Sequence, residues 1–223
     1  LFGASCTYPA LTGTGSGGND KTKPGNELFR NGFKAAGLKV NDALYDWYVS
    51  TAGTYARKST GSGTSVTWSI GDARWAQIDT AAKTDKADAA VFIVSRMGGE
   101  GLDLDIDTGD KNDMTGGDYL TLSPSELDVL KNLKAEKAKG TFGKIIVVMN
   151  SSYQVCGFDN PEIAVDAVLW TGSIGGCGTY AIGNILAGKV NPSGKLSATF
   201  WTRHSKNPAM VNFGDFTYSG NPG

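Results

Sequence analysis

The sequence predicts an α/β protein: a three-layer α/β/α sandwich built on an open, mostly parallel sheet of about six strands. Short apolar runs rich in β-branched residues, such as 89–94 and the run within 144–149, are typical of strands buried on both faces of a parallel sheet. Segments with a helical spacing of apolar residues separate these runs. Strands that alternate with helices in this way form parallel sheets that helices cover on both faces.

Composition restricts the class of protein and its partners. The 223 residues, expected to form one domain, are 40% hydrophobic and 19% charged, with a net charge of -1. These values are typical of a globular chain and give no reason to expect a nucleic acid partner. No apolar run approaches the roughly 20 residues that cross a bilayer, so no membrane partner is expected. The chain begins at Leu1 without a signal peptide, which suggests a processed or excised chain.

The three cysteines, Cys6, Cys156 and Cys177, show no metal-binding spacing, and their odd number argues against a dense disulfide framework. We therefore expect buried, free thiols in a reducing compartment, which favours the cytoplasm over secretion. No metal and no cofactor is expected.

The first half of the chain is expected to alternate short strands with helices. Asn26 and Asn41 can each cap a helix, because an Asn side chain accepts hydrogen bonds from the first helical turn. Gly37 suits the end of the first helix. The stretch 59–67 is rich in Ser, Thr and Gly, which is typical of a loop. The expected elements, in order, are the end of a strand at 1–5, a helix over 28–36, a strand at 38–40, a helix bearing Leu44, Trp47 and Tyr48, a helix over 75–82 and a strand at 90–94.

The second half continues this alternation. Ser123 can cap a helix, Pro124 suits its first position, and Glu126 completes a capping box. Gly140 suits the end of that helix, and Gly188 the end of the next one. The remaining expected elements, in order, are strands at 144–149 and 165–170, a helix over 180–187, a turn at 191–194 and a last strand at 196–200.

Glu100 is the first candidate for chemistry. It follows the strand predicted at 90–94, and ligands of parallel sheets bind beyond the carboxyl ends of the strands. Gly99 and Gly101 on either side allow another chain or a substrate to approach closely. A carboxyl group that loses water in a closed site could act as a general acid. The residues alone also allow a solvated loop carboxylate, so the role stays open.

Other candidates have weaker support from the residues. The stretch 13–17 (Gly-Thr-Gly-Ser-Gly) matches neither nucleotide-binding fingerprint, but Ser16 could face a polar ligand. The aspartates after Glu100 do not follow the EF-hand pattern. His204, the one histidine, lies in a polar tail and is expected to be exposed, which gives little support to a catalytic triad. Ser173 lacks the first glycine of a nucleophile elbow.

Three stretches together resemble glycoside hydrolase family 3. Residues 95–103 (Ser-Arg-Met-Gly-Gly-Glu-Gly-Leu-Asp) look like the acid/base loop of that family. Residues 165–170 and 180–196 resemble the long signature at the end of the same domain, and 13–17 is similar to its first glycine-rich loop. The resemblance covers nearly the whole chain in the right order, and Asn-Pro-Ser-Gly-Lys-Leu at 191–196 is its most specific part.

The resemblance implies the α/β sandwich domain of a retaining, β-glucosidase-like enzyme that acts on a β-linked glucoside or oligosaccharide. In this family the active site lies between the sandwich domain and a (β/α)8 barrel. By this resemblance Glu100 is the acid/base residue, Ser16 lies near the sugar, and the nucleophilic aspartate lies on the barrel. This chain has no barrel, so the isolated chain is expected to be inactive or nearly so.

The sequence also departs from the family pattern. Leu104 stands where the family commonly has an arginine, and the stretch 171–177 lacks the usual Gly-Gln-Glu element. These departures suit an alternative from another class, a non-catalytic carbohydrate-binding or scaffold domain of the same fold. A nucleotide-binding α/β domain is a third hypothesis, which rests on 13–17 and a general fold argument.

Overall fold

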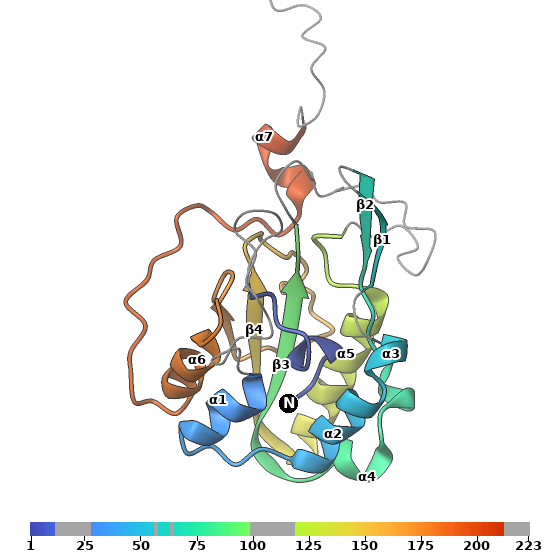
Figure 1. Ribbon diagram of the computed structural model, residues 1–223, viewed down its shortest axis with the longest axis vertical. Coiled ribbons are helices and arrows are strands. Elements are labelled where there is room, and N and C mark those ends of the chain that lie inside the picture. Colours follow the sequence, from blue (N-terminus) through green and yellow to red (C-terminus); the bar gives the residue numbers. More distant parts are fainter. Residues whose placement is uncertain (12–27, 56–57, 63–64, 99–118, 212–223) are drawn as a thin grey trace, which may run out of the picture.

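A parallel sheet forms the centre of the computed structural model, which describes residues 1–11, 28–55, 58–62, 65–98 and 119–211 (Figure 1). Its strands are β3 (Ala87–Arg96), β4 (Phe142–Ser151) and β5 (Ala167–Trp170), hydrogen-bonded in the order β3-β4-β5. Phe2 forms an isolated parallel bridge with Phe92 on the edge of β3 that faces away from β4. The described residues thus confirm a parallel sheet, with three strands and one bridge rather than about six strands.

Helices lie on both sides of this sheet. In Figure 1, α1 and α6 lie together on one side, and α5 lies on the other side with α2, α3 and α4. No helix in the described part of the chain is long and apolar enough to cross a membrane. The helices are α1 (Phe29–Ala35), α2 (Asp42–Ser50), α3 (Ala52–Tyr55), α4 (Thr80–Lys83), α5 (Pro124–Ala138), α6 (Gly178–Leu186) and α7 (Pro208–Val211), with 3-10 turns at Ala4–Cys6, Trp75–Gln77 and His204–Lys206.

Several helix ends confirm the predicted signals. The Asn41 side chain accepts a hydrogen bond from the Leu44 N–H at 2.9 Å and caps α2. Ser123 and Glu126 form the predicted capping box at the start of α5. Gly37 and Gly140, together with Gly188, end their helices with φ between 70° and 86°, a conformation that glycine adopts without steric cost. Asn26 lies outside the described residues.

Four predicted elements are wrong. No strand forms at 38–40, because the Leu38 N–H bonds to the Phe33 carbonyl at the end of α1 and the chain then enters the cap of α2. The loop predicted at 59–67 is an antiparallel hairpin of β1 (Lys58–Ser62) and β2 (Ser65–Ser69). The helix predicted at 75–82 is broken by the extended backbone of Ile78, and Asp79 then caps the short α4.

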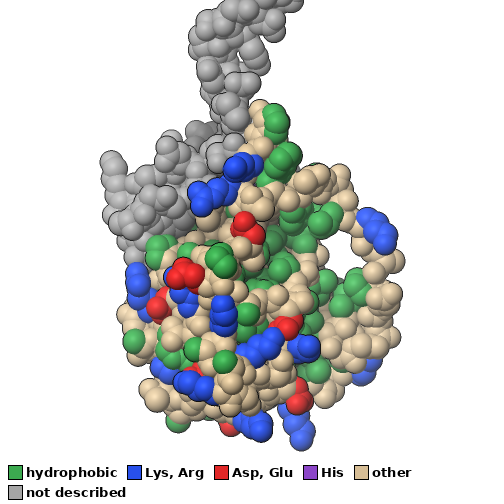
Figure 2. Space-filling model, turned by 180° about the vertical axis from the view of Figure 1, so that it is seen from behind, with side chains coloured by type: hydrophobic (Ala, Val, Ile, Leu, Met, Phe, Trp, Pro, Cys, Tyr) green, Lys and Arg blue, Asp and Glu red, His purple; other side chains and the backbone are tan. Residues whose placement is uncertain are grey.

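The fourth wrong element is the last strand, predicted at 196–200. Every residue from 188 to 199 is exposed, and Figure 2 shows this segment as an arm that stands away from the body of the molecule. This segment pairs with no strand among the described residues. It returns to the sheet at Phe200, whose ring packs edge to face on Trp170 with 5.4 Å between the ring centroids. A strand needs a neighbouring strand to accept and donate its backbone hydrogen bonds, and this segment has none among the described residues.

The hydrophobic core lies on both faces of β3 and β4. Phe92, Ile93 and Val94 of β3 and Ile145 and Val147 of β4 are each at most 1% exposed. Toward their carboxyl ends, the same strands bury polar side chains instead. This change from apolar to polar burial marks the edge of the sheet at which the candidate site was predicted.

Candidate functional site

The two residues predicted to act on a substrate, Glu100 and Ser16, both lie outside the described residues. The structure does describe the residues from which their segments leave the domain. Gly98 lies two positions after the end of β3, and Leu11 follows the N-terminal turn that begins after Phe2. The geometry of the candidate site is therefore built from these starting points and from the side chains that hold them.

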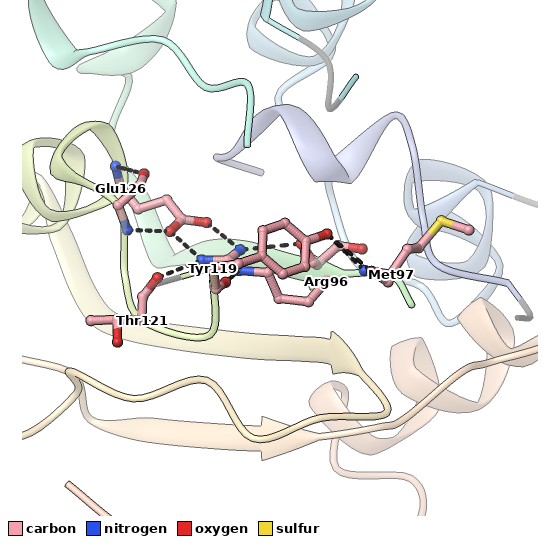
Figure 3. Close-up of polar contacts among 7 residues, drawn as sticks. Arg96, Met97, Tyr119, Thr121 and Glu126 are labelled. Atoms are coloured by element: carbon pink, nitrogen blue, oxygen red, sulfur yellow. Dashed lines mark hydrogen bonds and ion pairs between the residues drawn. The ribbon is translucent and has the colours of Figure 1, made fainter. Parts of the chain in front are cut away.

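Arg96, the last residue of β3, is completely buried together with Glu126 of α5 (Figure 3). Its Nη1 and Nη2 atoms donate to Glu126 Oε1 and Oε2 at 2.9 and 2.7 Å, a bidentate pair. The remaining donors reach backbone carbonyls: Nε that of Tyr119 at 2.5 Å, Nη1 that of Ser95 at 3.1 Å and Nη2 that of Thr121 at 2.9 Å. These five bonds equal the number of guanidinium N–H donors.

A second contact joins the same two stretches of chain. The Tyr119 hydroxyl accepts a hydrogen bond from the Met97 N–H at 3.0 Å and lies 3.2 Å from the Met97 carbonyl, to which it donates. Its ring centroid lies 5.6 Å from the Arg96 guanidinium carbon. Met97 and Tyr119 are therefore held side by side, although 22 positions separate them in the sequence.

The backbone of Gly98, the last described residue before Glu100, passes close to Tyr153, which follows β4. A Cβ atom placed on Gly98 would lie 2.5 Å from the Tyr153 hydroxyl, closer than side chains approach one another. Glycine at this position lets the chain leave β3 in close contact with the Tyr153 side chain. Gly99 and Gly101, at which the sequence predicts a close approach, lie outside the described residues, and at Gly98 the neighbour is a side chain of the same domain.

Asn150 of β4 joins the segment that precedes Ser16 to the loop that follows β5. Its side chain, fully buried, accepts from the Ala10 N–H at 2.6 Å and donates to the carbonyls of Ala10 at 3.0 Å and Gly172 at 2.7 Å. The N–H of Gly175 donates to the Leu11 carbonyl. Because Asn150 pairs with Ser95 in the sheet register, these segments and the start of the Glu100 segment leave the same edge.

Asp72 is a further acidic group that the sequence reasoning missed. Its Oδ1 accepts from the N–H groups of Ala73 at 2.7 Å and Ala4 at 3.2 Å, which places it beside the turn after Phe2. Burial, and next the negative charge of Glu126, raise the pKa of Asp72 to about 8. No sequence pattern around the half-buried Asp72 could have indicated this, because its contact with Ala4 spans 68 positions.

Three further predictions concern the histidine, Ser173 and the cysteines. His204 is buried rather than exposed, because it lies in the 3-10 turn before α7 and not in an open tail. The Ser173 hydroxyl meets that of Ser152 at 2.9 Å. All three cysteines are free; Cys6 and Cys156 are buried as expected, whereas Cys177 is exposed. Within the described ranges no three His, Cys, Asp or Glu side chains gather as a metal site would require.

Comparisons with known proteins agree with this architecture. The family model described as the glycosyl hydrolase family 3 C-terminal domain matches residues 1–221. The chain is 33% identical to a β-glucosidase of Schizophyllum commune over 156 residues, which cover 67% of this chain and 72% of that one. It is 32% identical to β-glucosidase A of Butyrivibrio fibrisolvens over 145 residues, 57% of this chain and 16% of the relative.

A solved structure of a β-glucosidase from Paenibacillus barengoltzii has the same fold. It superimposes with a TM-score of 0.76 at 24% identity, over 96% of this chain and 22% of that one. The chain thus spans about a sixth of the Butyrivibrio relative and about a fifth of the Paenibacillus structure.

Proposed function

The chain belongs to glycosyl hydrolase family 3, as a C-terminal domain of that family, and we propose that it supplies the general acid/base residue, Glu100, of a retaining β-glucosidase. The observation that carries the proposal is that the buried strand β3 ends at Arg96, four positions before Glu100 in the sequence. In a parallel sheet this edge is where ligands bind. The two curated relatives named above are both β-glucosidases, which supports a β-glucoside as the substrate.

The proposed reaction is a double displacement that needs two carboxylates. An aspartate on a (β/α)8 barrel attacks the anomeric carbon, while Glu100 gives its proton to the leaving oxygen. Glu100, now a carboxylate, then takes a proton from water as this water attacks the anomeric carbon and releases the aspartate. In this scheme Ser16, whose segment leaves the same edge of the sheet, lies near the bound sugar.

Hydrolysis of an aryl β-glucoside tests the assignment of Glu100. The isolated chain is expected to show almost no activity, because one carboxylate cannot complete a double displacement. With a family 3 barrel domain supplied, activity is expected to appear, and Glu100→Ala is expected to lower kcat by about 10²- to 10⁴-fold on a substrate with a poor leaving group. Added azide is expected to restore turnover on a dinitrophenyl glucoside, since azide can replace water without a general base.

Glu162→Ala is a suitable control, because Glu162 is an exposed carboxylate in the loop before β5 that pairs with Lys131. It is expected to leave kcat and KM unchanged. Full activity of Glu100→Ala in the reconstituted enzyme would show that Glu100 is not the acid/base residue. Binding of glucose or cellobiose by the isolated chain, with no activity on reconstitution, would favour the binding module instead.

A further inference from the structure

We propose that Arg96, Tyr119 and Glu126 form a clamp that positions Glu100 for proton transfer. The clamp is defined by these three side chains, which join the end of β3 to the start of α5 (Figure 3). The inference rests on the proposed function, because it assigns Glu100 the role of acid/base residue. It goes beyond that function by naming side chains that touch no substrate and yet control how well the acid works.

The clamp holds together the two ends of the chain segment that carries Glu100. Arg96 lies four positions before Glu100, and its guanidinium binds the carbonyls of Tyr119 and Thr121 on the far side of the segment. The Tyr119 hydroxyl binds both backbone groups of Met97, three positions before Glu100. Each of these contacts spans 22 to 25 positions of sequence. The ends of the segment are therefore brought together by specific polar contacts, whatever a substrate contributes.

The residue types of the clamp suit a role in fixing the backbone in place better than a role in stabilising the folded domain. Arg96 and Glu126 are 0% and 3% exposed in their side chains, so both charges have lost their water. Well-packed apolar residues in place of a buried ion pair are often as stabilising or more so, because the pair must recover its desolvation cost. An apolar pair, however, could not bind three carbonyls in fixed directions, as the planar guanidinium does here.

Fixed ends matter for general acid catalysis, because proton transfer requires a donor within hydrogen-bond reach of the leaving oxygen. A displacement of about 1 Å in a catalytic group can lower a rate by about a hundredfold. Glu126 also belongs to the capping box of α5 through the Ser123 N–H. The clamp thus connects the start of the Glu100 segment to a helix that packs on the central strand β4.

The dependence of kcat/KM on the leaving group tests this inference in the reconstituted enzyme. Tyr119→Phe removes one hydroxyl and keeps the ion pair. We expect it to lower kcat/KM by about tenfold for a methyl β-glucoside, whose leaving oxygen needs a proton, and by less than about twofold for a 2,4-dinitrophenyl β-glucoside, which leaves without one. A general loss of folded enzyme would lower both values by the same factor, so the ratio isolates the position of the acid.

Tyr45→Phe is the matched control. Tyr45 is also completely buried, its hydroxyl has no hydrogen-bond partner within the described structure, and its ring lies under Arg30, away from the clamp. It is expected to leave both kcat/KM values unchanged. Arg96→Lys keeps the positive charge but cannot make the five bonds of the guanidinium, so it is expected to change the ratio at least as much as Tyr119→Phe.

Two results separate this inference from the proposed function. If Glu100→Ala changes the ratio strongly while Tyr119→Phe and Arg96→Lys both leave it at the unsubstituted value, the clamp does not position the acid and the inference is overturned. If Glu100→Ala leaves the ratio unchanged, the proposed function itself fails. A Tyr119→Phe ratio that shifts toward that of Glu100→Ala supports the clamp.

Discussion

Arg96 and Glu126 are the only pair of opposite charges in the described structure in which both side chains are almost completely buried. A buried charge that keeps its partner is tolerated, whereas one that loses its partner remains desolvated without compensation. At the scale of the residue, therefore, the two side chains are expected to be far more sensitive to substitution than the ion pairs on the surface.

Glu126→Ala is expected to lower the free energy of unfolding by about 3–5 kcal/mol, because it leaves the Arg96 guanidinium buried and unpaired. Urea denaturation followed by circular dichroism measures the change. Glu162→Ala, which breaks the exposed pair with Lys131, is expected to leave the midpoint in place. Equal shifts for the two variants would contradict the importance of burial.

At the scale of the element, α1 and α6 approach each other through two glycines. A Cβ on Gly32 would lie 2.4 Å from the backbone of Thr179, and one on Gly183 would lie 2.5 Å from the Gly32 carbonyl. The two helix backbones are therefore almost in contact. Neither position has room for a methyl group unless the helices separate.

Gly32→Ala is expected to destabilise the domain by about 1–3 kcal/mol, since a methyl group there would push α1 from α6. Gly53→Ala in α3 is the matched control, because a Cβ at that exposed position would meet nothing within 4 Å. It is expected to stabilise the domain by up to about 1 kcal/mol, through the lower freedom of the unfolded chain. Thermal unfolding is expected to show a lower midpoint temperature for Gly32→Ala and an unchanged or higher one for Gly53→Ala.

The sequence predicted those elements whose signals are local. The capping box at Ser123 and Glu126 and the cap at Asn41 involve residues three positions apart, and both are confirmed. The strand predicted at 196–200 is wrong because strand formation depends on a partner, which no local pattern specifies. The hairpin of β1 and β2 was missed because Ser, Thr and Gly outweighed Val66 and Trp68, whose types favour strands.

At the candidate site, too, local features could be predicted and long-range contacts could not. The place of Glu100 beyond a buried strand could be predicted, since the apolar run and the glycines adjoin it in the sequence. The contacts at the carboxyl ends of β3 and β4 could not be predicted, because Arg96 reaches Tyr119 across 23 positions and Asn150 reaches Ala10 across 140. From the sequence alone, an arginine at the end of an apolar run is expected to be a surface charge. Only the fold shows that Arg96 is buried and paired with Glu126.

At the scale of the whole molecule, Asp72 links folding to pH. It lies where the N-terminal turn meets the segment before α4, and burial followed by the charge of Glu126 raises its pKa to about 8. The unfolded chain releases this proton near the ordinary pKa of about 4. Between these two pH values the folded state holds a proton that the unfolded state has lost, so the free energy of unfolding falls as the pH rises.

Asp72→Asn is expected to flatten this dependence, because asparagine keeps the acceptor for Ala4 and Ala73 but carries no titrating proton. The measurement is the free energy of unfolding of both proteins at several pH values from 4 to 9. The stability of the variant relative to the unsubstituted protein should rise steadily up to about pH 8 and then stay constant. Parallel curves for the two proteins would refute the role of Asp72.

The long-range contacts of the N-terminal residues have a consequence for synthesis on the ribosome. Ala10 binds Asn150, which is translated 140 residues later, so at about 5–20 residues per second the nascent segment waits roughly 7–28 s for its partner. Gly175, whose N–H donates to the carbonyl of the buried Leu11, is translated later still. Residues 10 and 11 thus dock long after they are translated, and in the meantime they are a short apolar segment for a chaperone to bind.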